Sequence, residues 1–353
     1  MASPQYDVAA LRDFSRDLLA AAGAGDADAE LVAHSLVDAD RAGIFSHGLL
    51  RLPLYLRAME AGGIDATARP RVVREHGAVT VLEAGSTFGQ VAMQQAVEIA
   101  GSAAATHGMA GVAVQGSTHF GAGRFWMEQL AEQGLAGILT STTGPVAAPF
   151  GGSRPILGTN PLSIALPSAG PSPLIVDLAT TAGAYGKVVA AHQEGQTIPA
   201  DWAVDATGEG TIDPGAVLDG GALLPFGGHK GSGVAVLIEG LSAALSSAAF
   251  AFRTVDIWQD PSSQMNTGHL LLALDIAAFG DPDQVRRKVE ELQQEVRASH
   301  PAAEVMAPGD LESSRLRAAA HSVELAPSTV AQLRELAAVR GAQFPAPLEE
   351  GTS

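Results

Sequence analysis

Short apolar runs alternate with helical patterns along this chain of 353 residues, and the alternation limits its fold more than any other feature. Apolar residues recur at helical spacing over residues 7–22, 28–42 and 89–107. The runs GVAVQG (111–116) and LAGILTST (135–142) are short and apolar, as buried strands are. We therefore expect a mixed α/β protein with several lobes and no internal repeat.

The second half of the chain continues the alternation. Two strands are predicted in PILGTNPLSIALP (155–167) and PLIVDLAT (173–180), joined by a turn of small residues and proline. A helix is predicted over 186–194, and a long loop region rich in Gly, Pro and Asp follows over 195–232. The remaining predictions are a strand at 268–276 and helices at 123–133, 233–248, 282–299 and near 328–340.

One segment, GVAVLIEGLSAALSSAAFAF (233–252), is long and apolar enough to raise the question of a membrane span. Glu239 lies inside it, and Gly, Ser and Ala dilute its hydrophobicity. We therefore expect a buried helix that packs closely through its small residues.

Charge and composition exclude several classes of function. The formal net charge of −17 argues against a nucleic-acid or anionic-membrane partner, because both need a basic protein surface. The chain has no cysteine, which excludes disulfides, thiolate metal sites and a cysteine nucleophile. Its first residues lack a basic segment followed by an apolar core, so we expect no secretory signal and a cytoplasmic protein.

Familiar sequence signatures of catalytic and nucleotide sites are missing. The segments GAGRFW, GEGTID, GSGVAV and GAGDAD all lack the third glycine of the Rossmann fingerprint. No G-x-S-x-G elbow occurs, and the ten histidines do not show metal-site spacing. A Rossmann dehydrogenase, a serine hydrolase and a metal enzyme are therefore not indicated.

Two lysines stand beside glycines, Lys187 in YGKV and Lys230 in FGGHKGSG. A cation next to exposed backbone N–H groups can receive a phosphate. The same pattern is also typical of a solvated loop lysine, and the spacing does not decide between the two.

The stretch FSHGLLR (45–51) places an imidazole and a guanidinium close together after a mostly apolar helix. Reduction of a 2-oxo acid needs a proton for the carbonyl oxygen and a cation for the carboxylate. Histidine titrates near neutral pH, and the arginine fork binds both carboxylate oxygens. His47 and Arg51 can therefore serve as an acid and an anion clamp, or decorate the surface.

The motifs taken in order carry a resemblance. They are SHG with Arg51 and Tyr55, then GSTHFGAG (116–123), GTNPLSIALP (158–167), VDLATTAGAYGKV (176–188), IPADWAVDATGEGTIDP (198–214), LLPFGGHKGSGVAVLIEGLS (223–242) and NTGHLLLALDI (266–276). From about residue 7 to about 340 the chain resembles the malate/L-lactate dehydrogenase family of non-Rossmann NAD(P)-dependent oxidoreductases. That family includes ureidoglycolate and sulfolactate dehydrogenases and piperideine/pyrroline-2-carboxylate reductases.

The resemblance implies a fold and an assembly. The expected α/β fold joins a helical N- and C-terminal part to a largely antiparallel cofactor-binding sheet. It divides the chain into a helical part with the Ser-His-Gly motif (1–75), a cofactor- and substrate-binding part (76–265) and a strand-helix part that packs back on the first (266–353). It also implies a homodimer with a small carboxylic acid as substrate.

By resemblance, His47 is the proton donor, Ser46 and Asp177 orient it, and Arg51 holds the substrate carboxylate. Tyr55 and Thr159 are expected to line the substrate pocket. His119 competes with His47 for the acid/base role, and the alternative assignment makes it polarise the substrate or contact the nicotinamide.

For the cofactor, NAD or NADP, the resemblance points to His119, Thr143, Asp177, Leu178, Ala179, Thr180, His229, Lys230, Gly309 and Asp310. Two departures from the family pattern are visible: Gly309-Asp310 replaces a usual Gly-Glu, and IPADWA replaces IPxGWA. No motif names a cation for a 2′-phosphate, so the choice between NAD and NADP stays open.

The implied activity is hydride transfer between NAD(P)H and a small 2-oxo acid. The alternative is reduction of a cyclic imine acid, in which the same histidine serves the nitrogen. A more remote alternative is a catalytically silent relative that binds a small anion or nucleotide.

Overall fold

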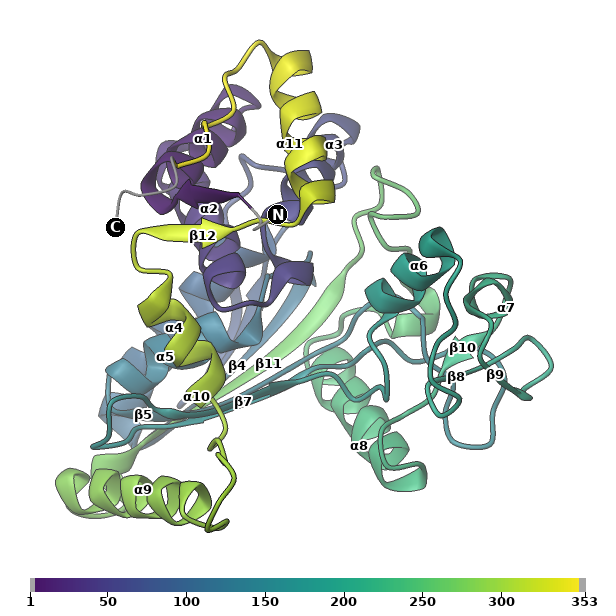
Figure 1. Cartoon of the computed structure of the whole chain (residues 1–353). Coiled ribbons are helices and arrows are strands. Elements are labelled where there is room, and N and C mark those ends of the chain that lie inside the picture. Colours follow the sequence, from purple (N-terminus) through teal and green to yellow (C-terminus); the bar gives the residue numbers. More distant parts are fainter. Residues whose placement is uncertain (1–3, 349–353) are drawn as a thin grey trace.

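A computed structural model describes residues 4–348 and shows a helical part above a broad sheet, with a smaller lobe beside them (Figure 1). The helical part combines both ends of the chain, since β1 (Gln5–Asp7) pairs antiparallel with β12 (Ser322–Glu324). Its helices are α1 (Val8–Ala21), α2 (Asp26–Arg41), α3 (Leu52–Ala61) and α11 (Pro327–Arg340).

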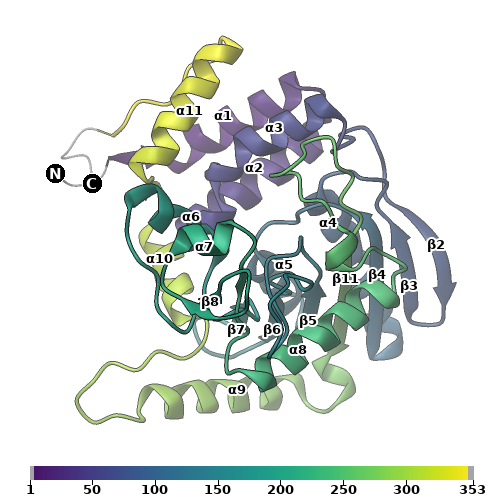
Figure 2. The ribbon, with the colours of Figure 1, turned by 90° about the vertical axis from the view of Figure 1, so that its right-hand side faces the viewer.

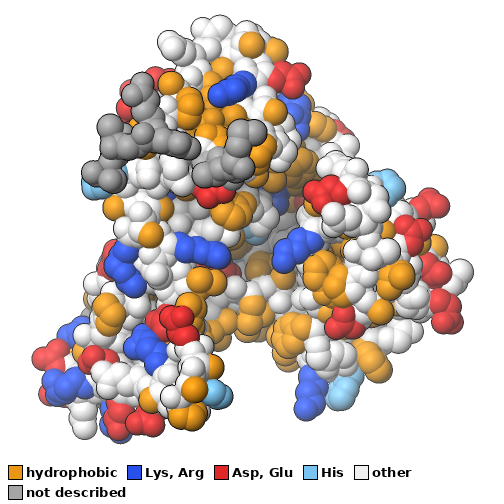
Figure 3. All heavy atoms as spheres, in the orientation of Figure 1, with side chains coloured by type: hydrophobic (Ala, Val, Ile, Leu, Met, Phe, Trp, Pro, Cys, Tyr) orange, Lys and Arg blue, Asp and Glu red, His pale blue; other side chains and the backbone are white. Residues whose placement is uncertain are grey.

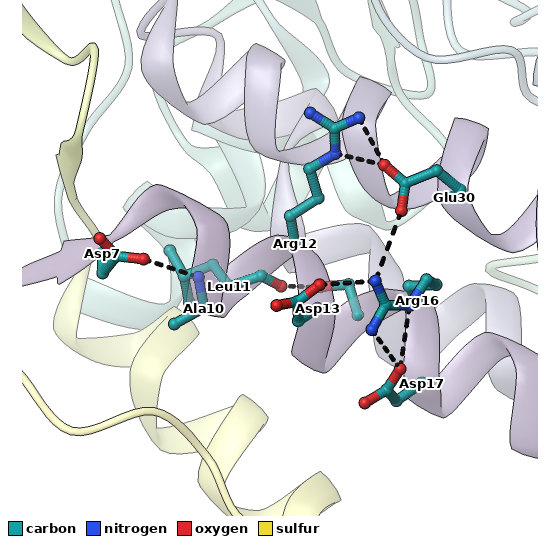
Figure 4. A network of polar contacts seen from close by, with 9 residues as sticks. Asp7, Ala10, Leu11, Arg12, Asp13, Arg16, Asp17 and Glu30 are labelled. Carbon is teal, nitrogen blue, oxygen red and sulfur yellow. Dashed lines mark hydrogen bonds and ion pairs between the residues drawn. The ribbon is translucent and has the colours of Figure 1, made fainter.

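Polar contacts fix where α1 begins and how it meets α2. The side chain of Asp7 accepts a hydrogen bond from the backbone N–H of Ala10 at 2.7 Å and so caps α1. Arg12 donates to Glu30 of α2 at 2.6 Å, and Arg16 lies 3.9 Å from the same carboxylate (Figure 4). Surface pairs of this kind stabilise a fold by about 0–1 kcal/mol, so burial of apolar side chains holds the helices together, including Leu11, Leu19, Leu36, Leu52 and Leu333.

The central sheet has the strand order β2-β3-β4-β11-β5-β6-β7. Only β3 and β4 pair in parallel, and every other neighbouring pair in this sheet is antiparallel. The largely antiparallel sheet that the resemblance implied is therefore confirmed. Its strands are β2 (Arg71–His76), β3 (Val79–Glu83), β4 (Met109–Ser117), β5 (Leu135–Ser141), β6 (Leu162–Leu166), β7 (Leu174–Leu178) and β11 (Thr267–Asp275).

Helices cover both faces of this sheet (Figure 2). Leu139 of β5 packs in the core formed with α4 (Gly89–His107) and α5 (Gly123–Glu132). Successive strand side chains point to opposite faces, and the next residue, Thr140, reaches Ser242 at 2.8 Å. Ser242 follows α8 (His229–Glu239), which therefore lies on the other face.

A smaller lobe is built between β7 and α8. It contains α6 (Tyr185–Glu194), α7 (Pro214–Leu218) and a three-stranded sheet ordered β10-β8-β9. Its own small core includes Val188, Val217, Leu223 and Ala235. The three strands are β8 (Ala203–Val204), β9 (Gly210–Thr211) and β10 (Ala222–Leu223).

The C-terminal segment returns along the sheet to the helical part. α9 (Pro282–Arg297) follows β11 and donates through Gln293 to the carbonyl of Ser172 in the β6–β7 turn. α10 (Asp310–Ala318) then leads to β12. This return brings β12 beside β1, from the opposite end of the chain.

Two predictions about the middle of the chain are wrong. The helix predicted over 233–248 begins at His229, ends at Glu239 and passes into a π turn, Gly240–Ala244. It is not buried all round, since Leu237 and Leu245 are 67% and 57% exposed. The loop region predicted over 195–232 also holds α7, three short strands and the first turn of α8.

Within residues 4–348, no helix is long and apolar enough to cross a membrane. Several elements were missed because their own pattern is weak. β2 is exposed along its whole length, so it shows no apolar alternation. α3 begins with five consecutive buried residues, Leu52–Leu56, so its apolar residues show no helical period.

Candidate active site

The Ser-His-Gly motif sits on two consecutive 3₁₀ turns, η1 (Phe45–His47) and η2 (Leu49–Arg51). α2 ends just before them, and the buried Asp40 in its last turn accepts a hydrogen bond from the backbone N–H of Leu49 at 2.8 Å. Burial raises the pKa of Asp40 to about 7. A carboxyl group under the turn therefore fixes where His47 and Arg51 stand.

His47 is held from two sides. Its Nδ1 lies 2.9 Å from the hydroxyl of Ser46, and its ring stacks on that of His119 with centroids 5.3 Å apart. Protein surrounds the imidazole, although part of its surface stays open to solvent. Burial, and then the charge of Arg51, lower the pKa of His47 to about 3. The ring is neutral at physiological pH in this state.

The guanidinium of Arg51 lies near enough to His47 for its charge to lower the pKa of that imidazole. Its Nε donates to the carbonyl of Ser46 at 2.8 Å, and its guanidinium carbon lies 5.0 Å from the ring centroid of Trp258. Within residues 4–348 the two terminal nitrogens form no hydrogen bond. They can therefore bind both oxygens of a carboxylate.

Tyr55 is buried, and its hydroxyl forms a hydrogen bond with His119. Its hydroxyl lies 2.6 Å from Nδ1 of His119 and accepts a hydrogen bond from Gln90 at 3.1 Å. Burial raises the pKa of Tyr55 to about 12, so the hydroxyl keeps its proton and donates it to the imidazole. The backbone N–H of Gly121 also donates to Nδ1, at 3.3 Å.

These two donors fix the tautomer of His119. A nitrogen that accepts hydrogen bonds carries no proton, so Nδ1 of His119 is bare. Burial lowers the pKa of His119 well below its ordinary value, which keeps the ring neutral. Its Nε2 therefore carries the proton and acts as a hydrogen-bond donor.

Asp177, which was expected to orient His47, forms hydrogen bonds with Ser163 and Arg124. Its carboxylate accepts from Ser163 Oγ at 2.6 Å and from the backbone N–H of Arg124 at 2.9 Å. Burial raises its pKa. In the described part of the chain Asp177 makes no hydrogen bond with His47, so the expected orienting contact is corrected to a cap on the start of α5.

Three threonines predicted for cofactor and substrate lie together. Thr143 Oγ1 accepts from the backbone N–H of Thr159 at 2.9 Å, and Thr180 donates through both N–H and hydroxyl to the carbonyl of Thr159. They come from the segments after β5, before β6 and after β7. Leu178 and Ala179 connect the end of β7 to this cluster.

The start of α8 lies beside these threonines, because the backbone N–H of Phe226 donates to the carbonyl of Thr180 at 3.0 Å. Gly227 and Gly228 have φ of 58° and 65°, a conformation that favours glycine. No side chain of residues 4–348 caps the helix that follows, and His229 and Lys230 are its exposed first residues. Open N–H groups and a lysine fit the diphosphate of a nicotinamide cofactor.

Lys187, the other lysine beside glycine, lies in α6 with its amine 5.9 Å from the ring centroid of Trp202.

Gly309 and Asp310 lie against β7, since Ile175 donates its N–H to the carbonyl of Pro308 at 3.4 Å. Arg297 binds both oxygens of Asp310, at 2.8 and 2.7 Å, and this contact lowers the pKa of the carboxyl. A ribose hydroxyl at this carboxylate would therefore compete with a two-bond ion pair.

The molecule is hollowed between the sheet with its helices and the smaller lobe, as Figure 3 shows. Sequence reasoning missed residues that shape this site: Asp40, Gln90, Asp256 and Trp258. Asp40 offered a signal, because it falls four residues after the buried Leu36, on the apolar side of α2. The other three stand outside every motif, so no local pattern indicated them.

Comparison with known proteins agrees with the motifs. Residues 6–334 match the family described as malate/L-lactate dehydrogenase. A Delta(1)-pyrroline-2-carboxylate/Delta(1)-piperideine-2-carboxylate reductase of Pseudomonas syringae pv. tomato is 37% identical over 332 residues, which cover 93% of this chain and 94% of that protein. A (2R)-3-sulfolactate dehydrogenase (NADP(+)) of Chromohalobacter salexigens is 36% identical over 322 residues, 91% of this chain and 95% of that one.

A solved structure shares the fold. Sulfolactate dehydrogenase from Methanocaldococcus jannaschii superposes with a TM-score of 0.89 at 33% identity, covering 96% of this chain and 98% of the other. The match over nearly the whole length confirms the fold and the family that the ordered motifs predicted. The chain therefore belongs to the malate/L-lactate dehydrogenase family of NAD(P)-dependent oxidoreductases.

Proposed function

We propose that this protein transfers a hydride between NAD(P)H and a small 2-oxo acid, using the cluster of His47, His119 and Arg51. The observation that carries the proposal is the stacking of the two imidazoles, 5.3 Å apart, next to a guanidinium whose two terminal nitrogens have no hydrogen-bond partner among residues 4–348. A carboxylate held at Arg51 places the neighbouring carbonyl within reach of both rings. When bound, the reduced nicotinamide supplies the hydride for the carbonyl carbon.

His47 moves the proton in this scheme. In the free site its pKa is about 3, so it holds a bare nitrogen that can accept the proton of a 2-hydroxy acid. In the direction of reduction it must be protonated first. A substrate carboxylate at Arg51 offsets the guanidinium charge, which favours the imidazolium and lets His47 donate to the carbonyl oxygen.

His119 assists without titrating. Its Nε2–H donates a hydrogen bond, because Tyr55 and Gly121 both donate to Nδ1. A fixed donor at the carbonyl oxygen stabilises the negative charge that develops there. We therefore assign proton transfer to His47 and polarisation of the substrate to His119.

The remaining residues position these groups and receive the cofactor. We propose that Ser46 orients His47 and that Asp177 holds the start of α5. The nucleotide is proposed to lie along Thr143, Asp177-Leu178-Ala179-Thr180, His229-Lys230 and Gly309-Asp310, with Thr159 facing the substrate. In this scheme residues 1–75 bring the catalytic turn, 76–265 the cofactor surface, and 266–353 the strand and helices that close the molecule.

Reduction of a cyclic imine acid is the second candidate, favoured by the 37% identity to a pyrroline/piperideine-2-carboxylate reductase. Arg51 would hold the same carboxylate, and His47 would serve the ring nitrogen in place of the carbonyl oxygen.

We propose that the protein works as a homodimer. α8 and the π turn present an apolar face of Val236, Leu237, Leu241 and Leu245, each 42–67% exposed. Burying this face against a second copy removes apolar area from water. Leu237→Lys should give a monomer in light scattering, whereas Leu292→Lys, on Leu292 of α9, which is 54% exposed, should leave the dimer intact. Because the proposed reaction consumes a nicotinamide cofactor, we propose that the protein works in the cytoplasm.

The test of function is nicotinamide absorbance with NADH and NADPH, each offered with pyruvate, oxaloacetate, 2-oxoglutarate, sulfopyruvate and piperideine-2-carboxylate. Oxidation with an oxo acid supports the main proposal, and oxidation with the imine alone supports the second. If no acid is reduced although calorimetry shows cofactor binding, the protein is a silent relative and the proposal fails.

A further inference from the structure

A loop of thirteen residues, 254–266, joins the 3₁₀ turn Ala251–Arg253 to β11, and its Trp258 reaches Arg51, the proposed carboxylate clamp. Asp256 accepts a hydrogen bond from the backbone N–H of Trp258 at 2.9 Å, which turns the chain sharply. Farther along, the carbonyl of Pro261 packs against Gly63 after α3. The loop is therefore anchored on the helical part that carries Arg51.

Trp258 covers the guanidinium of Arg51. The indole centroid is 5.0 Å from the guanidinium carbon, and 49% of the Trp258 surface is exposed. A cation over an indole face is attracted to it. Arg51 thus has an apolar wall on one side, while its terminal nitrogens, which have no partner in the described part of the chain, can bind a carboxylate.

Asp256 lies between the clamp and the cofactor segment. It packs against Gly144, next to Thr143, and a side chain at residue 144 would place its Cβ 3.1 Å from the Cβ of Asp256. Its charge acts on both Arg51 and Tyr55. No ion pair within 4.0 Å joins Asp256 to Arg51 in residues 4–348, so the carboxylate is near the clamp but leaves it free.

Among residues 4–348, the cation whose charge acts on the pKa values of His47, His119 and Tyr55 is Arg51. The carboxylate whose charge acts on those of Arg51 and Tyr55 is Asp256. A substrate with one carboxylate pairs with the cation. A second anionic group would meet the indole of Trp258 or the carboxylate of Asp256, and like charges in a partly buried site repel.

We infer that this site selects acids with a single anionic group, whose uncharged remainder packs against Trp258 while Asp256 repels a second anion. The inference rests on the proposed function and narrows it to monocarboxylates such as pyruvate, 2-oxobutyrate or piperideine-2-carboxylate. Dianions such as oxaloacetate and sulfopyruvate are disfavoured.

The experiment compares kcat/KM for pyruvate and 2-oxobutyrate with that for oxaloacetate and sulfopyruvate, at fixed ionic strength. The unmodified protein should prefer the monoanions by about tenfold or more, which corresponds to about 1.4 kcal/mol. Asp256→Asn keeps an oxygen for the N–H of Trp258 but removes the charge, and should reduce that preference about tenfold. Asp260→Asn is the matched control, because Asp260 forms the same turn with Ser262 in the same loop and should leave the preference unchanged.

Three results would contradict the inference or the function. Equal or better use of dianions overturns the inference but leaves the dehydrogenase function standing. A preference that survives Asp256→Asn, or that Asp260→Asn removes as well, also overturns the role of Asp256. Inactivity toward all acids, with or without cofactor binding, overturns the function and the inference together.

Discussion

The Cα of Gly48 lies directly against the carboxyl group of Asp40, so that a Cβ at residue 48 would overlap both carboxyl oxygens. Gly48 has φ of −86°, which any residue can adopt. Glycine is therefore required here by contact rather than by backbone conformation. The contact between Asp40 and Gly48 therefore fixes how far the turn that carries His47 stands from α2.

Gly48→Ala should lower kcat strongly. The added methyl group must push the turn away from Asp40, and a displacement of about 1 Å at a catalytic group can cost about 100-fold in rate. Steady-state kinetics with the best substrate would measure this. Gly280→Ala is the control, because no atom of the described residues lies within 4 Å of a Cβ added at Gly280. An unchanged kcat in Gly48→Ala would show that the turn tolerates the shift.

Asp40→Asn should change how stability depends on pH. The pKa of Asp40 is about 7 in the folded protein and about 3.9 in an unfolded chain. The folded state thus holds the proton more tightly, so this stabilisation is full below pH ~4 and is lost as pH rises through ~7. Urea unfolding at pH 5 and pH 8 should therefore show a larger loss in the unmodified protein than in Asp40→Asn.

His47, Asp38 and the other titrating groups are the same in both proteins, so their contributions cancel in this comparison. An equal loss of stability in the two proteins would mean that Asp40 is ionised throughout.

The two histidines should respond differently to replacement. His47→Asn removes the group that moves the proton and should lower kcat by about 10²–10⁴-fold. His119→Asn keeps a hydrogen-bond donor near the carbonyl oxygen and should mainly raise KM. Steady-state kinetics of both variants, with thermal unfolding to check folding, separate the roles. Abolished turnover in His119→Asn with only a raised KM in His47→Asn would reverse the assignment.

The pH profile gives an independent test of His47. Its pKa of about 3 leaves the protonated fraction falling as pH rises from 5 to 8. The kcat/KM for reduction of an oxo acid should therefore fall with rising pH, by up to about tenfold per unit. Oxidation of the hydroxy acid needs the neutral ring and should stay level over the same range. A reduction rate that increases with pH is incompatible with His47 as the proton donor.

The sequence predicted more of the scaffold than of the site. α4 matches its predicted range because its apolar face and its C-terminal glycine are local signals. The strand pairing of β11 between β4 and β5 is not local, and only the resemblance suggested an antiparallel sheet. α8 was misplaced because its first turn, His229–Gly231, carries no apolar periodicity and looks like a continuation of the glycine-rich loop.

In the site, too, local motifs could be predicted from the sequence and contacts between distant segments could not. His47, Arg51 and the threonines stand in recognisable motifs, and the structure brings the threonines together. Asp256 and Trp258 reach the clamp through a loop that follows it by about two hundred positions in the chain. Such a contact depends on tertiary packing, so no spacing in the sequence could reveal it.

Asp177 provides the last test, because it separates an orienting role from a capping role. Its carboxylate accepts from Ser163 and from the backbone N–H of Arg124, as a cap on α5. Asp177→Ala should therefore lower the free energy of unfolding by about 0.5–2 kcal/mol, measured with urea. Ser163→Ala should cost less, because the carboxylate keeps its bond to Arg124.

The apparent pKa in the pH profile of kcat decides between the two roles of Asp177. If the carboxylate stabilised the imidazolium of His47, Asp177→Asn would lower that pKa by about one unit or more, since an adjacent anion favours the charged ring. The groups that shift the pKa of His47 are its buried surroundings and Arg51, so as a cap Asp177 should leave the midpoint of the profile unchanged in Asp177→Asn. A shifted midpoint would restore the orienting role and would place Asp177 nearer to His47 when substrate and cofactor are bound.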